Sequence, residues 1–159
     1  MRPPFVYTMR VRFRDTDAQG HVYFGNYFVF CDEAMSAYMR AIGAPWQEMV
    51  KSGTDMFYVN ATCDYQGSAR FEEDIHIETR ISNVGTSSVT TTFVIRNHRG
   101  DTLANASVSS VCVDPKTREK VKVPDRLRDA VATFERGERP ASEVHGSLKM
   151  RSRSGRGEG

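Results

Sequence analysis

One segment limits the fold more than any other, because the apolar stretch from Tyr27 to Ile42 has the period of an α-helix. Apolar residues recur there at spacings of three and four, at Tyr27, Phe30, Cys31, Ala34, Tyr38 and Ala41. Others widen this face beyond a single stripe, namely Phe28, Val29, Met35, Ala37, Met39 and Ile42. A helix with so broad an apolar face is usually enclosed on most sides. The sequence therefore predicts a buried central helix of about four turns, closed by Gly43 and Pro45.

Strand-like segments stand before and after this helix. Residues 5–13 alternate in polarity, with Val11 and Phe13 on the apolar face of the predicted strand. Four later segments are rich in β-branched and aromatic residues and are separated by turn residues, at 57–66, 74–85, 87–98 and 102–114. Gly-containing connections predict that the later strands are antiparallel neighbours. The pattern predicts an α+β fold of about five strands around one long helix.

The end of the chain contains a short helix and then a change in composition. Pro124 opens a segment with helical apolar spacing, which predicts a helix over 124–135. Residues 136–159 are rich in Gly, Ser and Arg and have no apolar period. With 159 residues in total, we expect one domain over 1–135 and a disordered basic tail over 136–159.

The bulk composition excludes several classes of partner and site. A net charge of +2 does not favour nucleic acid. No apolar run approaches the roughly 20 residues of a spanning helix, and the N-terminal segment does not resemble a secretion signal, so we expect a cytoplasmic protein without membrane insertion.

The three cysteines lack C-x-x-C spacing, and no metal site, disulfide framework or cofactor is predicted. Motifs for nucleotide hydrolysis, zinc peptidases and serine hydrolases are missing.

The turn before the helix carries two carboxylates, Asp15 and Asp17, in the stretch "FRDTDAQGHVYFGNY". Such residues are common in turns for structural reasons, because Asp accepts hydrogen bonds from nearby amides. An ionised carboxylate can also attack a thioester carbonyl or deprotonate water. Asn26 is the predicted N-cap of the helix, and Asp32 is expected on or beside its first turn, where negative charge suits the helix dipole.

The segment "VRFRDTDAQGHVYFGNYFVFCDEA" resembles the start of the 4-hydroxybenzoyl-CoA thioesterase family of hotdog acyl-CoA thioesterases. That family has a D-x-D-x-x-G-x-V element followed by an aromatic pair, a small residue and N-Y or S-Y. The later segments "CDYQGSARFEEDIHIETRISNVG" and "VDPKTREKVKVPDRLR" are also similar to it. The resemblance covers roughly residues 7–135 and implies the hotdog fold.

The resemblance implies that Asp17 is the catalytic carboxylate of an acyl-CoA thioesterase, as nucleophile or general base. Asp15 is expected to tie the turn or to pair with Arg12 or Arg14. Amides from Phe24 to Tyr27, at the helix start, would receive the negative charge on the carbonyl oxygen. The family also implies a homodimer, often paired into a homotetramer, with pockets built from two subunits. Asn26 and Tyr27 would support the turn, and Asp32 would reach the pocket or the subunit contact.

Other candidate groups have open roles. His21 is expected at the rim or in a structural role in the loop, although an imidazole there could protonate the leaving thiolate. Some relatives carry a histidine where this chain has Phe24, so its absence puts an imidazole-assisted mechanism in doubt. Aromatic residues near the helix start fit either core packing or an acyl pocket; they are Tyr23, Phe24 and Phe28, with Trp46 and Phe57 as additions. Cations available for coenzyme A are Arg70, Lys116, Arg118, Lys120 and Lys122.

Two rival functions remain open at this point. Hotdog hydratases and dehydratases act on enoyl or hydroxyacyl thioesters, but they usually use a His with an Asp at another spacing. A non-catalytic protein could use the same cleft to hold acyl-CoA or acyl carrier protein, because fold alone does not establish activity.

Overall fold

The computed structural model describes residues 2–137. The elements of this part of the chain are β1 (Phe5–Arg10), the 3-10 turn η1 (Phe13–Asp15), α1 (Asn26–Ala41), α2 (Trp46–Lys51), β2 (Asp55–Tyr65), β3 (Asp74–Val84), β4 (Ser88–Asn97), β5 (Thr102–Val113) and α3 (Asp125–Glu135). None of these helices is long and apolar enough to cross a membrane. The predicted tail over 136–159 lies outside the described residues, apart from Arg136 and Gly137.

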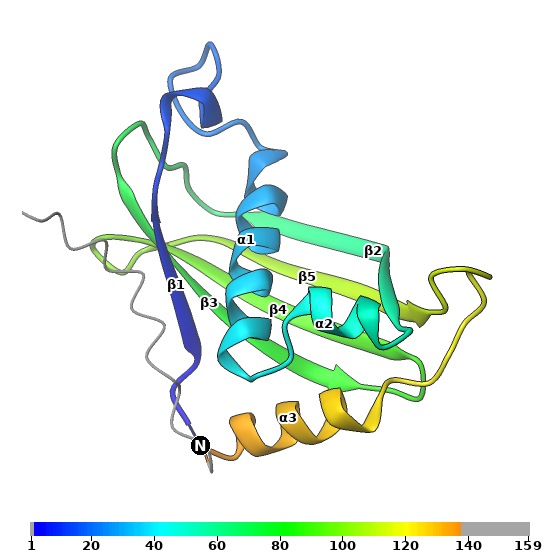
Figure 1. Ribbon diagram of the computed structural model, residues 1–159. Helices are drawn as coiled ribbons and strands as arrows, with labels where there is room; N and C mark the ends of the chain where they lie inside the picture. The colour runs from blue at the N-terminus through cyan, green and yellow to red at the C-terminus, as the bar shows by residue number, and fades with distance from the viewer. Residues whose placement is uncertain (1, 138–159) are drawn as a thin grey trace, which may run out of the picture.

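The strands form one sheet in the order β1-β3-β4-β5-β2, and every neighbouring pair is antiparallel. Helix α1 lies against one face of this sheet, and α3 runs along the end of the sheet near the N-terminus (Figure 1). The predicted α+β arrangement of about five strands around a long helix is therefore confirmed, as is the antiparallel pairing of the later strands.

The inner face of the sheet is defined by the strict alternation of buried residues with more exposed ones along β3 and β4. In β3 every second residue from Ile75 to Ile81 is buried, and in β4 every second residue from Val89 to Ile95 is buried. Successive side chains of a strand point to opposite faces, so this period of two puts one apolar row of each strand against the helix. The outer face keeps the polar rows.

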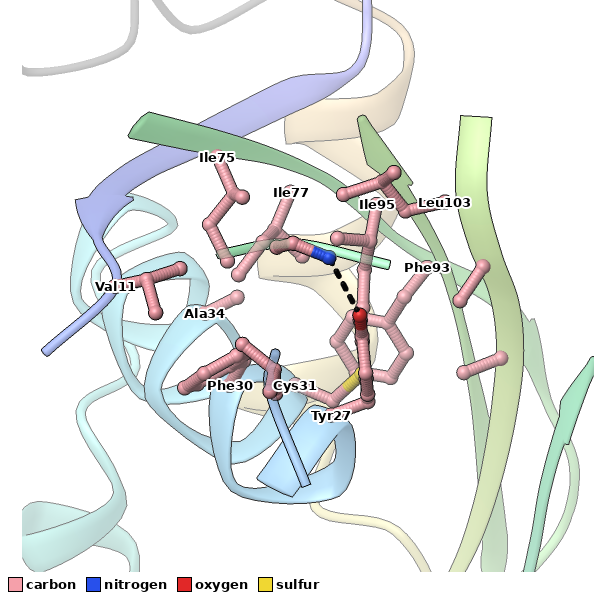
Figure 2. Close-up of a cluster of buried hydrophobic side chains, with 14 residues drawn as sticks. Val11, Tyr27, Phe30, Cys31, Ala34, Ile75, Ile77, Phe93, Ile95 and Leu103 are labelled. Atoms are coloured by element: carbon pink, nitrogen blue, oxygen red, sulfur yellow. Dashed lines mark hydrogen bonds between the residues drawn. The ribbon is translucent and has the colours of Figure 1, made fainter. Parts of the chain in front are cut away.

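The core lies between this row and α1. Phe30, Ala34 and Tyr38, spaced by four residues on one side of the helix, are each 0% exposed. Figure 2 shows Phe30 and Ala34 beside Ile75 and Ile77, and it also shows the hydrogen bond that the buried Tyr27 hydroxyl accepts from the Ala69 amide (3.1 Å). Burying a side chain such as Phe30 contributes about 1.5–3 kcal/mol.

The structure differs from the local predictions in two places, the end of the first strand and an additional short helix. The first strand ends at Arg10, and Phe13 lies in η1 with 76% of its surface exposed, although Val11 is buried as predicted. The central helix has a broad buried face, as predicted, and Val29 lies on its open side with 48% of its surface exposed. Helix α2 was not predicted; it follows Pro45 and packs Met49 into the core.

Strand β2 is an edge strand with an irregularity in its middle. The pairing with β5 shifts between Tyr58 and Asn60, so Val59 is an extra, bulged residue. Much of the strand is open, with Tyr58 59% and Val59 61% exposed. Long exposed edges are sites where another strand can add.

Candidate active site

Asp17 lies at the start of a small closed loop between η1 and α1. An isolated bridge between Thr16 and Val22 closes the loop, and the Asp17 amide donates to the His21 carbonyl (3.0 Å). The Asp17 carboxylate accepts a hydrogen bond from the Gln19 amide (2.8 Å). Gly20 has a φ of +81°, which favours glycine because a Cβ would strain this backbone. The loop fixes the backbone of Asp17, and the residue as a whole is half-buried.

Asp15 is buried and holds the base of this loop. Its carboxylate accepts hydrogen bonds from the Arg12 amide (2.8 Å), Nε (3.0 Å) and Nη2 (3.1 Å). Burial raises the pKa of Asp15, but the hydrogen bonds from Arg12 outweigh it and hold the pKa below its ordinary value. Asp15 is therefore a structural carboxylate paired with Arg12, one of the two partners expected for it.

The carbonyl of Asp15 ties the loop to the start of α1. It accepts hydrogen bonds from the Tyr23 amide (3.0 Å) and from Asn26 Nδ2 (2.9 Å). Asn26 is therefore not the N-cap. It is the first residue of α1, its side chain donates backwards to the loop, and Gly25 occupies the cap position without a side-chain bond. The sequence therefore identified Asn26 as a residue that stabilises the helix start, but its side chain bonds the Asp15 carbonyl and does not cap the helix.

Two amides ahead of the helix have no acceptor among residues 2–137, namely those of Phe24 and Gly25. The first amides of a helix point outward and suit negative charge. A Cβ added to Gly25 would lie 2.7 Å from the Tyr23 ring, so glycine at this position lets the ring pack against the backbone.

Tyr65 and Tyr27 support this end of α1. The Tyr65 hydroxyl donates to the Phe24 carbonyl (2.8 Å), and the Tyr65 ring packs edge-on against Tyr27, with ring centroids 5.4 Å apart. Tyr27 is buried and anchors Ala69, as described above. The last residue of β2 therefore fixes the segment that carries the two free amides.

His21 and Phe24 take positions at the surface of the loop. His21 is half-buried, and its Nδ1 lies 3.2 Å from the Val22 carbonyl. Phe24 is 62% exposed, and its ring contacts Tyr23 and Tyr65.

Asp32 lies beside the first turn of α1, one of the two positions expected for it. The helix begins at Asn26, so Asp32 falls on the second turn, and the first turn holds no acidic residue. Its carboxylate accepts a hydrogen bond from the Tyr58 hydroxyl of β2. This partner was missed because a contact between residues 26 positions apart leaves no local signal.

Two neighbouring cavities lie between α1 and the β2 side of the sheet. The first has a volume of about 110 Å³ and is almost entirely apolar, with Phe28 and Phe93 among its lining residues. The second, of about 370 Å³, extends to Trp46. Phe57, which was a possible pocket residue, lines neither; its ring lies under the guanidinium of Arg118, 5.5 Å from the ring centroid.

The candidate cations for coenzyme A are not gathered at one place. Arg70 lies beside the loop of Asp17, where its Nη1 would be 3.9 Å from a Cβ on Gly20. Lys116, Arg118, Lys120 and Lys122 follow β5 and precede α3. Among residues 2–137, no group of three or more His, Cys, Asp or Glu side chains could hold a metal ion.

Comparison with known proteins gives consistent results. Residues 11–131 match the model of the Thioesterase-like superfamily. The acyl-CoA thioester hydrolase YbgC of Escherichia coli is 29% identical over 77% of this chain and 92% of its own. The 1,4-dihydroxy-2-naphthoyl-CoA hydrolase of Synechococcus elongatus is 28% identical over 75% of this chain and 88% of its own. A solved gentisyl-coenzyme A thioesterase superposes with a TM-score of 0.72 at 27% identity, covering 78% of this chain and 99% of that one.

Proposed function

Because the chain belongs to the thioesterase-like superfamily, we propose that it hydrolyses an acyl-CoA thioester to the free acid and coenzyme A. The observation that carries the proposal is the link between the loop of Asp17 and the start of α1. The Asp15 carbonyl joins the two, and the amides of Phe24 and Gly25 there have no acceptor among residues 2–137. The hydrolase names of the relatives YbgC and 1,4-dihydroxy-2-naphthoyl-CoA hydrolase support the same reaction class.

Asp17 supplies the carboxylate of the reaction in one of two ways. As a general base it takes a proton from water, and the resulting hydroxide attacks the thioester carbon. As a nucleophile it attacks that carbon itself and forms a mixed anhydride, which water then cleaves. In both cases the carbon–sulfur bond breaks, the sulfur leaves as thiolate and takes up a proton, and the acid is released.

The free amides of Phe24 and Gly25 act on the carbonyl oxygen. Negative charge develops on this oxygen as the tetrahedral centre forms, and fixed amides that point at it lower the barrier. The leaving group needs little help, because a thiol has a pKa of about 8.5 and is a stable thiolate. The reaction therefore does not need an imidazole at the position of Phe24, and His21 is left as a rim residue.

The assembly that we propose is a homodimer formed through the edge of β2, which can pair further into a tetramer. In this arrangement the β2 edge gains a partner strand, and the groove beside α1 is covered by the second subunit. Arg70, which lies beside the loop of Asp17, would then be available to a phosphate of coenzyme A.

Release of free thiol from a panel of acyl-CoAs tests the proposal, with Asp17→Asn and Asp17→Ala beside the parent. We expect both substitutions to lower kcat by about 10²-fold or more, because general acid–base groups contribute about 10²–10⁴. Binding of acyl-CoA, measured by calorimetry, should be retained. Asp64→Asn is the matched control, because Asp64 is an exposed carboxylate next to Tyr65 on β2 and is not part of the loop.

Three results would count against parts of the proposal. Full activity in Asp17→Asn would reject the mechanism. Binding of acyl-CoA by the parent without thiol release would identify a non-catalytic binding protein. Hydration of an enoyl-CoA without release of thiol would identify a hydratase.

A further inference from the structure

The two cavities described above form a groove between α1 and β2, and side chains of β2 lead from this groove to the helix start. The helix-facing side chains of β2 lie along it in order. Tyr65 packs on Phe24 at the helix start, with ring centroids 6.3 Å apart. Ala61 then lines the first cavity, Tyr58 lines both cavities, and Met56 lines the second. An acyl chain whose carbonyl lies at the helix start would therefore run along this groove and reach the cavities one after the other.

A single hydrogen bond crosses the groove between the two cavities. The Tyr58 hydroxyl on β2 donates to the Asp32 carboxylate on α1, and we call this pair the crossbar. Both residues of the crossbar, together with Met35, line the first cavity and also the second. The two cavities are therefore compartments of one groove, with the crossbar at their boundary.

The compartments differ in size and in lining. The first, of about 110 Å³, has apolar walls from the sheet, including Phe93 and Val108. The second, of about 370 Å³, is lined by methionines 35, 39 and 56 and by Trp46. Methionine side chains are flexible and adapt to irregular apolar guests.

We propose that the crossbar sets the length of the acyl group, so that the enzyme prefers short aliphatic acyl-CoAs. The inference rests on the proposed function, because it requires the thioester carbonyl at the helix start. An apolar cavity of about 150 Å³ holds one benzene molecule. The first compartment is smaller than this, so it suits a short aliphatic chain better than an aromatic ring.

The chemistry of the crossbar opposes longer chains. A methyl end that passes this point must separate the Tyr58 hydroxyl from the Asp32 carboxylate. Both groups would then be covered by hydrocarbon without a replacement partner, and an unpaired polar group in such a place is costly. In the single chain Tyr58 is 59% exposed and Asp32 is exposed as well, so this cost applies where the second subunit of the proposed dimer covers the groove. Partial desolvation and the hydrogen bond to Asp32 already raise the pKa of Tyr58 above its ordinary value.

The test measures kcat/KM against chain length for straight-chain acyl-CoAs in the parent, Tyr58→Ala and Tyr58→Phe. Removal of the ring joins the compartments, and each added methylene buried among the methionines should then improve kcat/KM roughly fourfold. For a chain four methylenes longer, the preference should rise on the order of a hundredfold. Tyr58→Phe keeps the ring but not the bond, and its profile should move in the same direction by less.

Phe57→Ala is the matched control. Phe57 is the neighbouring aromatic residue on the same strand, it lines neither compartment, and its ring faces Arg118 instead. Its length profile should match that of the parent. An unchanged profile in Tyr58→Ala, or a parent that prefers long or aromatic acyl groups, would overturn the inference.

A second readout separates this inference from the proposed function. Alkyl-CoA thioethers cannot be hydrolysed, and calorimetry with the same chain lengths gives their affinities. If the parent cleaves no thioester, the proposed function fails, and the thioether affinities of the parent and Tyr58→Ala alone decide the role of the crossbar. If the parent cleaves thioesters but the two proteins show one profile, only the length inference fails.

Discussion

Asp15 and Asp17 are two residues apart and have opposite surroundings. Asp15 is 4% exposed and its carboxylate is occupied by Arg12. Asp17 is half-buried, and among residues 2–137 its carboxylate accepts a hydrogen bond only from an amide of its own loop. A carboxylate that is saturated by an arginine is a poor base, while one held by a single amide can still approach a substrate. This contrast supports Asp17 as the reacting group.

Asp15→Asn should lower stability in a pH-dependent way. Hydrogen bonds to charged groups contribute about 1.5–3 kcal/mol, and we expect a loss of this size at pH 7. The native pKa of Asp15 is lowered, so its contribution is complete above the ordinary value of about 3.9 and is lost as pH falls through the native value. Denaturant unfolding of both proteins at pH 7 and at about pH 3 should show the difference shrinking on acidification.

The control for this substitution is Asp74→Asn. Asp74 pairs with Arg10 at 2.8 Å, but the two side chains are 42% and 67% exposed, and exposed pairs contribute little. Equal effects of the two substitutions, or a loss in Asp15→Asn that does not change with pH, would contradict the structural role given to Asp15.

At the scale of single residues, the sequence indicated which side chains take part in the site better than it indicated their hydrogen-bond partners. For Asp15 the sequence offered two neighbouring partners, Arg12 and Arg14, and the structure pairs it with Arg12. The partner of Asp32 was not anticipated, because Tyr58 approaches it from another element. The position of Asp32 beside the first turn was expected, because the helix begins within one residue of its predicted start.

At the scale of elements, one carboxylate of α3 joins this helix to both α1 and β3. Glu135, the last residue of α3, accepts a hydrogen bond from the Tyr38 hydroxyl of α1 (2.6 Å) and pairs with Arg80 of β3 (3.0 Å). Burial, together with the bond to Glu135, raises the pKa of Tyr38 well above its ordinary value. The three elements therefore meet at one partly buried polar cluster.

Two substitutions of Glu135 separate its charge from its hydrogen bond. Glu135→Gln keeps an acceptor for Tyr38 and removes the charge beside Arg80, while Glu135→Ala removes both. We expect Glu135→Ala to cost about 1–3 kcal/mol, because the buried Tyr38 hydroxyl loses its partner, and Glu135→Gln to cost less. Thermal unfolding of the two variants measures this order, and the reverse order would show that the charge matters more than the hydrogen bond.

The elements themselves were well predicted where their period was strong. The helix over 26–41 and the alternating strands β3 and β4 carry a clear apolar pattern, and burial in the structure follows it. Helix α2 has six residues, too few for a period to show. The first strand was extended too far because Phe13 continues the alternation in sequence, while the chain turns at η1.

At the scale of the whole molecule, the two sheet edges differ. Strand β1 has six residues and β2 has eleven, and the exposed large apolar side chains of β2 include Tyr58, Val59 and Tyr65. The longer and more apolar edge is the better candidate for the subunit contact.

Lysine substitutions on the two edges test this choice. Val59→Lys on β2 should shift the protein to monomers, because a charge on an edge strand opposes pairing. Val6→Lys on β1 is the control, with a valine that is also exposed (46%). Light scattering coupled to size-exclusion chromatography gives the mass of each. If only Val6→Lys dissociates the protein, the subunit interface is at β1 and not at β2. If the parent is already a monomer, the proposed interface does not exist.

The bulge at Val59 divides β2 into two halves with separate tasks. Residues before it border the second compartment and carry Tyr58, while residues after it lead to Tyr65 and the start of α1. A bulge bends a strand and interrupts its ladder locally, so changes in one half need not be transmitted to the other. For enzyme engineering, residues 55–58 are therefore the segment to vary. Substitutions there can change the proposed acyl preference without altering Tyr65 and the start of α1.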